Sequence, residues 1–215
     1  MIDVRTFQCN MLQENCYVLS DDTREAVVID PGAFYDNEQK AINQYIDEKG
    51  LKLKHVLCTH AHFDHIFGAN ALYTAYGLQP ELHAADRFLY DSASRQASMM
   101  LGVPVQLDMP PAAATSLTDG QSIGFGSHTL RVLHTPGHSP GGVFFYCAEE
   151  RIAFSGDTLF RMSVGRTDLQ QGSWKDLMQS LKDVVAKLPA DTVVYTGHGP
   201  RTRIADEVSM NPYFL

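Results

Sequence analysis

Residues 59–65, Thr-His-Ala-His-Phe-Asp-His, constrain this chain more than any other stretch, because four metal-competent side chains fall within six consecutive positions. Just before them, residues 54–59 are apolar and partly β-branched, which is typical of a buried strand that runs into a loop. If His60 and His62 remain extended, the period of two places both imidazoles on one side of the chain, where they can share one metal ion.

The rest of this motif predicts a second, adjacent metal site. Asp64 and His65 fall where the backbone turns into residues 66–76, whose apolar spacing and following Gly77 predict a short helix. A tight bend there aims the two side chains at a point beside the first ion. Solvated loop histidines are the alternative interpretation in a chain with nine histidines. A site for two metals needs further ligands, and these should lie at other strand ends.

Three later strand ends each supply such a residue. A Pro-Gly turn after an apolar run presents His138 on a rigid loop. Asp157 and His198 each follow another apolar, strand-like run and are flanked by glycine. His134 lies before the Pro-Gly turn and is expected to face elsewhere, and His83 is expected to have a structural role. The chain therefore offers seven candidate ligands.

Between these motifs the chain alternates predicted strands and helices in two halves. A connection rich in proline and alanine, residues 104–114, separates the halves. Asp30 sits at a strand-to-loop corner, where it is expected to cap the turn rather than to bind metal. The strands are predicted at 4–7, 16–19, 26–30, 54–59, 81–84, 123–126, 129–133, 143–146, 152–155 and 192–195, and the helices at 37–49, 66–76, 85–101 and 174–188.

Length and composition indicate a globular protein that does not rely on cysteine. The 215 residues, 44% of them hydrophobic, suit one large domain or two small ones with ample material for a buried core. The four cysteines are widely spaced and form no Cys-x-x-Cys pair, so they are expected to be small buried hydrophobes. Any metal must then be held by nitrogen and oxygen.

The charge of the chain favours a small-molecule substrate. A net charge of −8 without a basic run argues against nucleic acid as a partner. An acidic surface also repels anions, so an anionic substrate would need a locally placed cation. The N-terminus lacks the pattern of a signal peptide and no apolar run approaches a membrane span, so we expect a cytoplasmic protein without a membrane partner.

Taken in order, the motifs strongly resemble those of the metallo-β-lactamase superfamily. They are Thr-His-Ala-His-Phe-Asp-His at 59–65, Thr-Pro-Gly-His at 135–138, Gly-Asp-Thr at 156–158 and Gly-His-Gly at 197–199, and they span nearly the whole chain. The resemblance implies an α/β fold, the αβ/βα four-layer sandwich, in which two facing mixed β-sheets carry helices outside and the metal site lies at one edge between the sheets. It also implies a single domain over residues 1–215.

The resemblance further implies how the seven candidates share two metal ions. One ion would be held by His60, His62 and His138, the other by Asp64, His65 and His198, and Asp157 would bridge both. Two dications about 3.5–4 Å apart repel strongly unless a carboxylate and a hydroxide lie between them. Asp64 and Asp157 are the expected catalytic residues. Zinc is the expected divalent metal, with iron or manganese as alternatives, because His and carboxylate sites accept all three.

Within the superfamily, the chain looks most like glyoxalase II and its short bacterial relatives. The segments 156–160 and 197–200 and the closing Asn-Pro-Tyr-Phe at 211–214 carry this similarity. It implies hydrolysis of S-(2-hydroxyacyl)glutathione or related thioesters by a metal-bridging hydroxide, with a glutathione-linked small molecule as partner. Zinc β-lactamases generally have a cysteine where this chain has Asp157, so antibiotic hydrolysis is disfavoured.

Recognition of the thiol carrier is the point where the chain departs from glyoxalase II. The longer enzymes add a C-terminal helical domain that supplies basic residues for glutathione, and we expect no such domain here, because the sequence continues for only about fifteen residues after Pro200. Residues 164–166 occupy the place where glyoxalase II has a Gly-Lys pair near the glutathione carboxylate. Arg166 is therefore the candidate substrate-binding cation, and a salt-bridged loop arginine is the alternative.

Two other functions compete with the hydrolase. Residues 165–168, followed by Gln-Gln-Gly at 170–172, resemble a motif of persulfide dioxygenases, in which one iron would be bound by His62 or its neighbour, His138 and Asp157. Another hydrolase of the same fold is a further alternative. A non-catalytic module stabilised by metal is disfavoured, because a structural zinc needs only four ligands.

Overall fold

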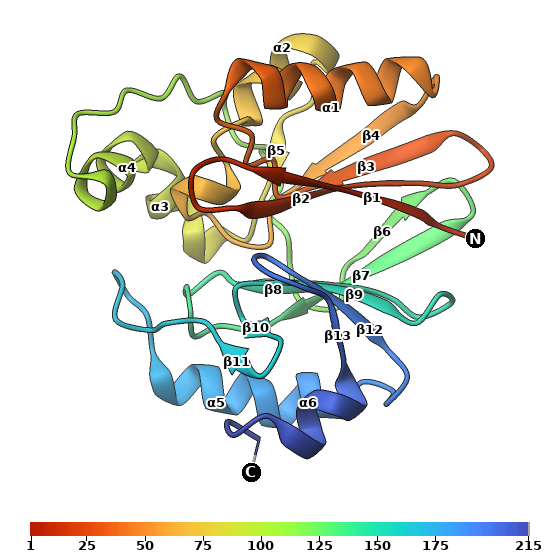
Figure 1. Ribbon diagram of the computed structural model, residues 1–215, viewed down its shortest axis with the longest axis vertical. Helices are drawn as coiled ribbons and strands as arrows, with labels where there is room; N and C mark the ends of the chain where they lie inside the picture. Colours follow the sequence, from red (N-terminus) through yellow and green to blue (C-terminus); the bar gives the residue numbers. More distant parts are fainter. Residues whose placement is uncertain (215) are drawn as a thin grey trace.

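The computed structural model describes residues 1–214, which form two β-sheets that face each other, with helices on the outer side of each sheet (Figure 1). The strands of the first sheet, in their order across it, are β1 Asp3–Cys9, β2 Glu14–Ser20, β3 Glu25–Ile29, β4 Lys52–Leu57 and β5 Pro80–Glu81. The first three pair antiparallel, whereas β3, β4 and β5 pair in parallel.

The second sheet is mixed as well. In their order across it, its strands are β13 Thr202–Arg203, β12 Val193–Thr196, β9 Ile152–Gly156, β8 Val143–Cys147, β7 His128–His134 and β6 Ser122–Phe125. Only β12 and β9 pair in parallel. Two short strands, β10 Leu159–Phe160 and β11 Ser163–Val164, form a separate hairpin.

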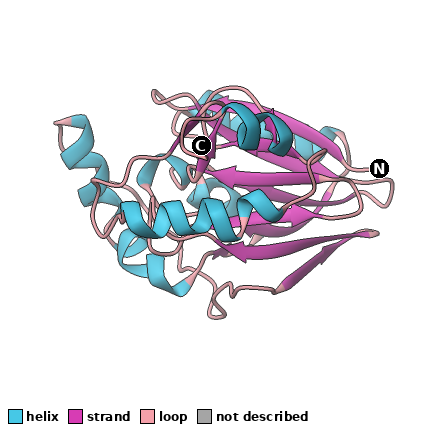
Figure 2. Cartoon of the chain, turned by 90° about the horizontal axis from the view of Figure 1, so that it is seen from below, coloured by secondary structure: helices cyan, strands magenta, loops and turns pink. Residues whose placement is uncertain are grey.

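Helices complete four layers. The first sheet is covered by α1 Asp36–Glu48 and α2 Ala69–Tyr76, and the second by α5 Trp174–Asp183 and α6 Ile204–Met210 (Figures 1 and 2). Two further helices, α3 Arg87–Asp91 and α4 Ala93–Leu101, lie at one end of the sandwich. Short 3-10 turns occur at Phe63–His65, Ala84–Asp86 and Val185–Lys187. The predicted αβ/βα sandwich is therefore confirmed. Among residues 1–214, none of the helices combines the length and apolar character that a membrane crossing requires.

The apolar side chains are sorted into the spaces between these layers. Alternating strand residues from both sheets, such as Leu19, Leu130 and Phe154, fill the central space and have no exposed surface. The helix α1 places Ile42 and Ile46 four positions apart on one face, and both are buried against the outer face of the first sheet. A similar cluster lies between the second sheet and α5. Burial of these faces fixes both sheets relative to their helices.

Several predicted elements have different limits in the structure. The helix expected at 85–101 is broken at Ser92, whose hydroxyl donates to the Phe88 carbonyl and competes with the regular helical pattern. The helix expected from residue 66 begins at Ala69, because the preceding residues form a 3-10 turn. The strand expected at 81–84 is limited to two residues, and the helix expected to reach 188 ends at Asp183. The other predicted strands and helices are confirmed within a few residues.

Candidate metal centre

The loop after β4 delivers the first four candidate ligands. The strand ends at Leu57, and the Asp30 carboxylate then fixes Thr59 by accepting from its backbone N–H and its hydroxyl, both at 2.7 Å. His62 is extended, with φ −69° and ψ 147°, and the 3-10 turn that follows redirects the chain. This bend at Asp64 and His65 is the one expected from the sequence.

All seven candidate ligands meet at one end of the sandwich. The ligand atoms of three overlapping groups lie within 4.8 Å of one another inside each group. The groups are His60, His62 and His138; Asp64, His65 and His198; and His60, His65 and Asp157. The loops that follow β4, β7, β9 and β12 bring these residues together from both sheets.

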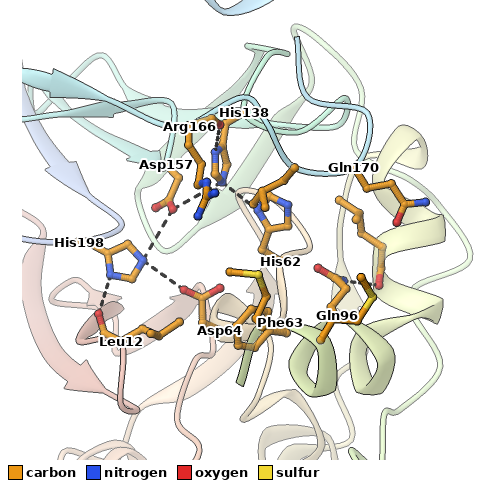
Figure 3. Close-up of a pocket in the computed structure, with 14 residues that line it drawn as sticks. Leu12, His62, Phe63, Asp64, Gln96, His138, Asp157, Arg166, Gln170 and His198 are labelled. Atoms are coloured by element: carbon orange, nitrogen blue, oxygen red, sulfur yellow. Dashed lines mark hydrogen bonds and ion pairs between the residues drawn. The ribbon is translucent and has the colours of Figure 1, made fainter. Parts of the chain in front are cut away.

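Asp157 lies between the two histidine sets. One carboxylate oxygen lies 3.3 Å from His65 Nε2, and the other lies 3.5 Å from His138 Nε2 and 3.7 Å from His198 Nε2. His198 Nε2 also lies 3.2 Å from the Asp64 carboxylate (Figure 3). Burial by itself raises the pKa of the Asp157 carboxyl, but its interactions with His65 and His138 hold that pKa well below its usual value.

Four buried polar atoms at this point have no hydrogen-bond partner among the described residues. They are Nε2 of His60, His62 and His65 and Oδ1 of Asp157. An unpaired buried polar atom costs free energy, so such a concentration requires an explanation. Burial also lowers the pKa of His60 well below its usual value and that of His62 to about 3, which keeps both imidazoles neutral with a free lone pair. Neutral imidazoles and carboxylates are the ligands that divalent transition metals accept, so the site fits a metal ion.

Backbone carbonyls orient two of the histidines. His138 donates from Nδ1 to the carbonyl of Arg166 at 2.7 Å, and His198 donates from Nδ1 to the carbonyl of Leu12 at 3.0 Å. Each bond leaves Nε2 facing Asp157. Gly165 makes room for the hydrogen bond between His138 and the Arg166 carbonyl, because a Cβ at residue 165 would lie 1.9 Å from the Asp157 carbonyl oxygen.

Asp30 has a different role from the one expected. Its carboxylate does not cap its own turn. It accepts a hydrogen bond from Thr59, and it also lies 3.1 Å from Nδ1 of His65. A carboxylate behind a histidine fixes the ring and its tautomer with Nε2 free. The turn-capping interpretation was therefore wrong.

Two further carboxylates were missed in the sequence. Asp86 accepts from the Ala61 N–H at 3.0 Å and from the Ser139 hydroxyl at 2.8 Å, so it joins the two loops that carry histidines. Glu14 is completely buried, lies 3.9 Å from His65 Nδ1, and has no hydrogen-bond partner for either oxygen within residues 1–214. Burial raises the pKa of Glu14 well above its usual value. No local sequence pattern marks either residue.

The other expected residues lie beside the centre. His134 faces away from the seven ligands and stacks on His83 with ring centroids 4.2 Å apart. Arg166 borders a cavity of about 400 Å³ that opens onto the centre (Figure 3). Its guanidinium donates to both carboxylate oxygens of Asp168, at 2.6 and 2.7 Å. Arg166 is thus both near the centre and paired within its own loop.

Comparisons with known proteins agree with this geometry. The family model described as the metallo-beta-lactamase superfamily matches residues 9–198. The hydroxyacylglutathione hydrolase GloC of Haemophilus influenzae is 32% identical over 214 residues, with 99% of this chain and 98% of the relative covered.

Two solved structures are also similar over nearly the full length. BLEG-1, described as a B3 metallo-beta-lactamase, has a TM-score of 0.89 and 37% sequence identity. The match covers 100% of this chain and 99% of the BLEG-1 chain. TTHA1623 in a di-iron-bound form has a TM-score of 0.85 and 39% identity, with 98% of this chain and 100% of that chain covered.

Proposed function

Because the chain belongs to the metallo-beta-lactamase superfamily, we propose that it is a metal-dependent hydrolase of thioesters, in particular S-(2-hydroxyacyl)glutathione. The observation that carries this proposal is the convergence of seven His and Asp side chains, four of which carry a buried polar atom without a hydrogen-bond partner among the described residues. A single structural metal would need only four of them. The similarity to a hydroxyacylglutathione hydrolase supports the thioester.

The proposed metal sites follow the grouping of the ligand atoms. His60, His62 and His138 would hold one ion, and Asp64, His65 and His198 would hold the other. Asp157 joins the two sites, since its two oxygens face histidines of different sets. Zinc is the proposed metal, and the similarity to a di-iron-bound structure makes iron the first alternative.

The residues of the chain divide the chemistry between binding and proton transfer. Two bound divalent ions would lower the pKa of a water molecule and polarise the carbonyl oxygen of the thioester. Asp157 would offset the repulsion between the ions, and Asp64, at the cavity wall, would accept the proton that the water gives up. The water oxygen then bonds to the carbonyl carbon, the carbon–sulfur bond breaks, and the sulfur leaves and takes a proton. Arg166 is proposed to face the carboxylate of the thiol carrier.

The experiment compares two substrates with the purified, metal-loaded protein. S-lactoylglutathione is supplied and thiol release is followed, and a β-lactam is supplied in parallel because a structurally similar protein is described as a β-lactamase. We expect thiol release and little β-lactam opening. Opening of the β-lactam without thiol release would overturn the proposed substrate.

One observation favours a second function, a persulfide dioxygenase. Arg166, in the dioxygenase-like stretch 165–168, lines the cavity and pairs with Asp168 of the same stretch. In this reading one iron is held by three of the candidate ligands. Oxygen uptake with glutathione persulfide, in the absence of thioester cleavage, would establish it in place of the hydrolase.

A further inference from the structure

The cavity at the metal centre has two chemically different sides. One side carries the candidate ligands and the loop with Arg166 and Gln170 (Figure 3). The other side is largely apolar and includes Phe63, Leu89, Met99 and Met100. We call these four residues the apolar wall.

The outer part of the apolar wall is exposed to solvent. Met99 is 72% exposed and Met100 is 49% exposed at the end of α4. Phe63 and Leu89, deeper in the cavity, are almost fully buried. An apolar surface that runs from a reactive centre to the rim is typical of a binding site for an apolar group.

The helix α4 is fixed relative to the metal centre. The Gln96 side-chain amide donates to the carbonyl of Ala61 at 3.1 Å and to that of Leu89 at 2.7 Å. Ala61 lies between two candidate ligands, and Ala97 packs against the cluster that includes Phe63. These contacts fix the helix that carries both methionines relative to the loop with the candidate ligands.

The charged side of the cavity is unsuited to an apolar chain. Arg166 supplies the one guanidinium or ammonium group among the lining residues, and the edge formed by its Nε and Nη2 is directed to Asp168. A thioester has two substituents, the acyl group and the thiol carrier. If the polar carrier lies along the loop with Arg166, the acyl group extends along the apolar wall.

We propose that the apolar wall binds the hydrocarbon chain of the acyl group, so that the enzyme prefers thioesters of long, apolar acyl groups to those of lactate. This inference rests on the proposed thioester hydrolase function. Each methylene removed from water should raise kcat/KM by about fourfold, until the chain passes beyond Met99 at the rim. Methionine suits such a site, because its flexible side chain adapts to chains of different shape.

The kinetic test uses S-(2-hydroxyacyl)glutathiones from lactoyl to 2-hydroxyoctanoyl. In the unaltered enzyme, kcat/KM should rise with chain length. The double variant Met99→Gln, Met100→Gln keeps the side-chain length but makes the wall polar, so the ratio of long-chain to short-chain kcat/KM should fall at least about tenfold. Met210→Gln is the matched control, because Met210 is an exposed methionine on α6 outside this cavity, and it should leave the ratio unchanged.

A second series decides which substituent occupies the wall. Lactoyl thioesters of alkyl thiols of increasing length vary the leaving group and keep the acyl group constant. Dependence on Met99 and Met100 in this series alone would overturn the proposal. A flat acyl series, or an unchanged ratio in the double variant, would overturn it as well.

A binding measurement separates this inference from the proposed function. Calorimetry with the free acids from lactate to 2-hydroxyoctanoate needs no turnover, and burial of the chain should give increasing affinity with a negative heat-capacity change. Chain-length-dependent binding that is lost in the double variant, without cleavage of any thioester, would support the wall and refute the hydrolase. Binding that is independent of chain length would refute the wall whatever the enzyme hydrolyses.

Discussion

Asp157 is the residue on which the proposed chemistry depends most, because its carboxylate lies between the two histidine sets. Asp157→Asn keeps the shape of the side chain and removes its charge. We expect the variant to fold, to contain fewer than two metal ions per chain, and to lose at least about a hundredfold in kcat. Circular dichroism, metal analysis and thioester turnover measure these three outcomes.

A purely structural role for Asp157 makes the opposite prediction. If the residue only stabilises the turn after Gly156, asparagine is an equally good substitute. Normal turnover and metal content in Asp157→Asn would therefore remove the bridge from the mechanism. Asp22→Asn, in an exposed turn, is the matched control for the loss of one carboxylate.

Glu14 gives a prediction about pH and stability in the metal-free protein. Burial raises its pKa in the folded state well above the usual value of about 4.3. As the pH rises above that value, the unfolded chain releases the proton while the folded chain retains it, so Glu14 lowers the stability of the fold. Glu14→Gln should remove this penalty, which amounts to at most about 1.4 kcal/mol per pH unit.

Urea denaturation of the chelated protein between about pH 4 and pH 8 checks the prediction about Glu14. The stability difference between Glu14→Gln and the unaltered protein should grow in favour of the variant as the pH rises. Glu48→Gln, on the exposed side of α1, should show no such trend. A constant difference across this range would mean that Glu14 has the same pKa in the folded and unfolded states, and it would contradict the prediction.

At the scale of elements, a single carboxylate connects two hairpin turns at the end of the sandwich away from the metal centre (Figure 1). Asp21, after β2, accepts from the backbone N–H groups of Thr23 at 3.0 Å and Ser127 at 2.7 Å, and it lies 3.0 Å from Nδ1 of His128. Burial opposes its charge, but these hydrogen bonds lower the pKa of Asp21 below its usual value. Asp21 thereby links the first sheet to the hairpin of β6 and β7.

Removal of this link should destabilise the fold without affecting the metal centre. We expect Asp21→Ala to lower the free energy of unfolding by about 2–3 kcal/mol, because several donors lose their acceptor at once. The stabilisation that Asp21 contributes to the fold is fully present above about pH 4. It is lost as the pH falls further, because the pKa of Asp21 is lower in the folded state than in the unfolded state. Urea denaturation and metal analysis measure the two effects, and Asp22→Ala is the control. A loss of metal in Asp21→Ala would show that the two ends of the sandwich are coupled.

At the scale of the whole molecule, the metals are expected to contribute to the stability of the fold. The candidate ligands come from loops of both sheets, so ions bound there would join the two halves. The purified protein should carry close to two ions per chain. A strong chelator should abolish turnover and lower the Tm by about 5–10 °C, because an ion that binds only the folded state stabilises it by mass action.

Metal analysis of two histidine variants completes this prediction. His198→Ala should retain about one ion per chain, since three ligands of the first site remain intact. His55→Ala, which removes a histidine outside the ligand groups, should retain both. A single ion in the unaltered protein, with the same content in His198→Ala, would contradict the two-metal arrangement.

The sequence by itself determined most of the elements and the seven candidate ligands, because those signals are local, but it did not predict β10, β11, β13 or α6. The period of two at His60 and His62, the apolar runs and the glycine after each strand are readable within a few residues. The order of the motifs then identified the family and its fold. Limits of elements were less predictable, as the break at Ser92 illustrates, since a side-chain hydrogen bond ended the helix.

Only the tertiary structure decided what surrounds those ligands. Asp30 contacts Thr59 across 29 positions of sequence, and Asp86 contacts Ser139 across 53. Glu14 and the methionines of α4 likewise acquire their surroundings from loops that are distant along the chain. Periodicity describes a residue's neighbours along its own element, whereas burial and hydrogen bonding between elements depend on how the two sheets pack. The sequence therefore identified the candidate ligands, and packing determined the carboxylates that orient them and the apolar wall beside them.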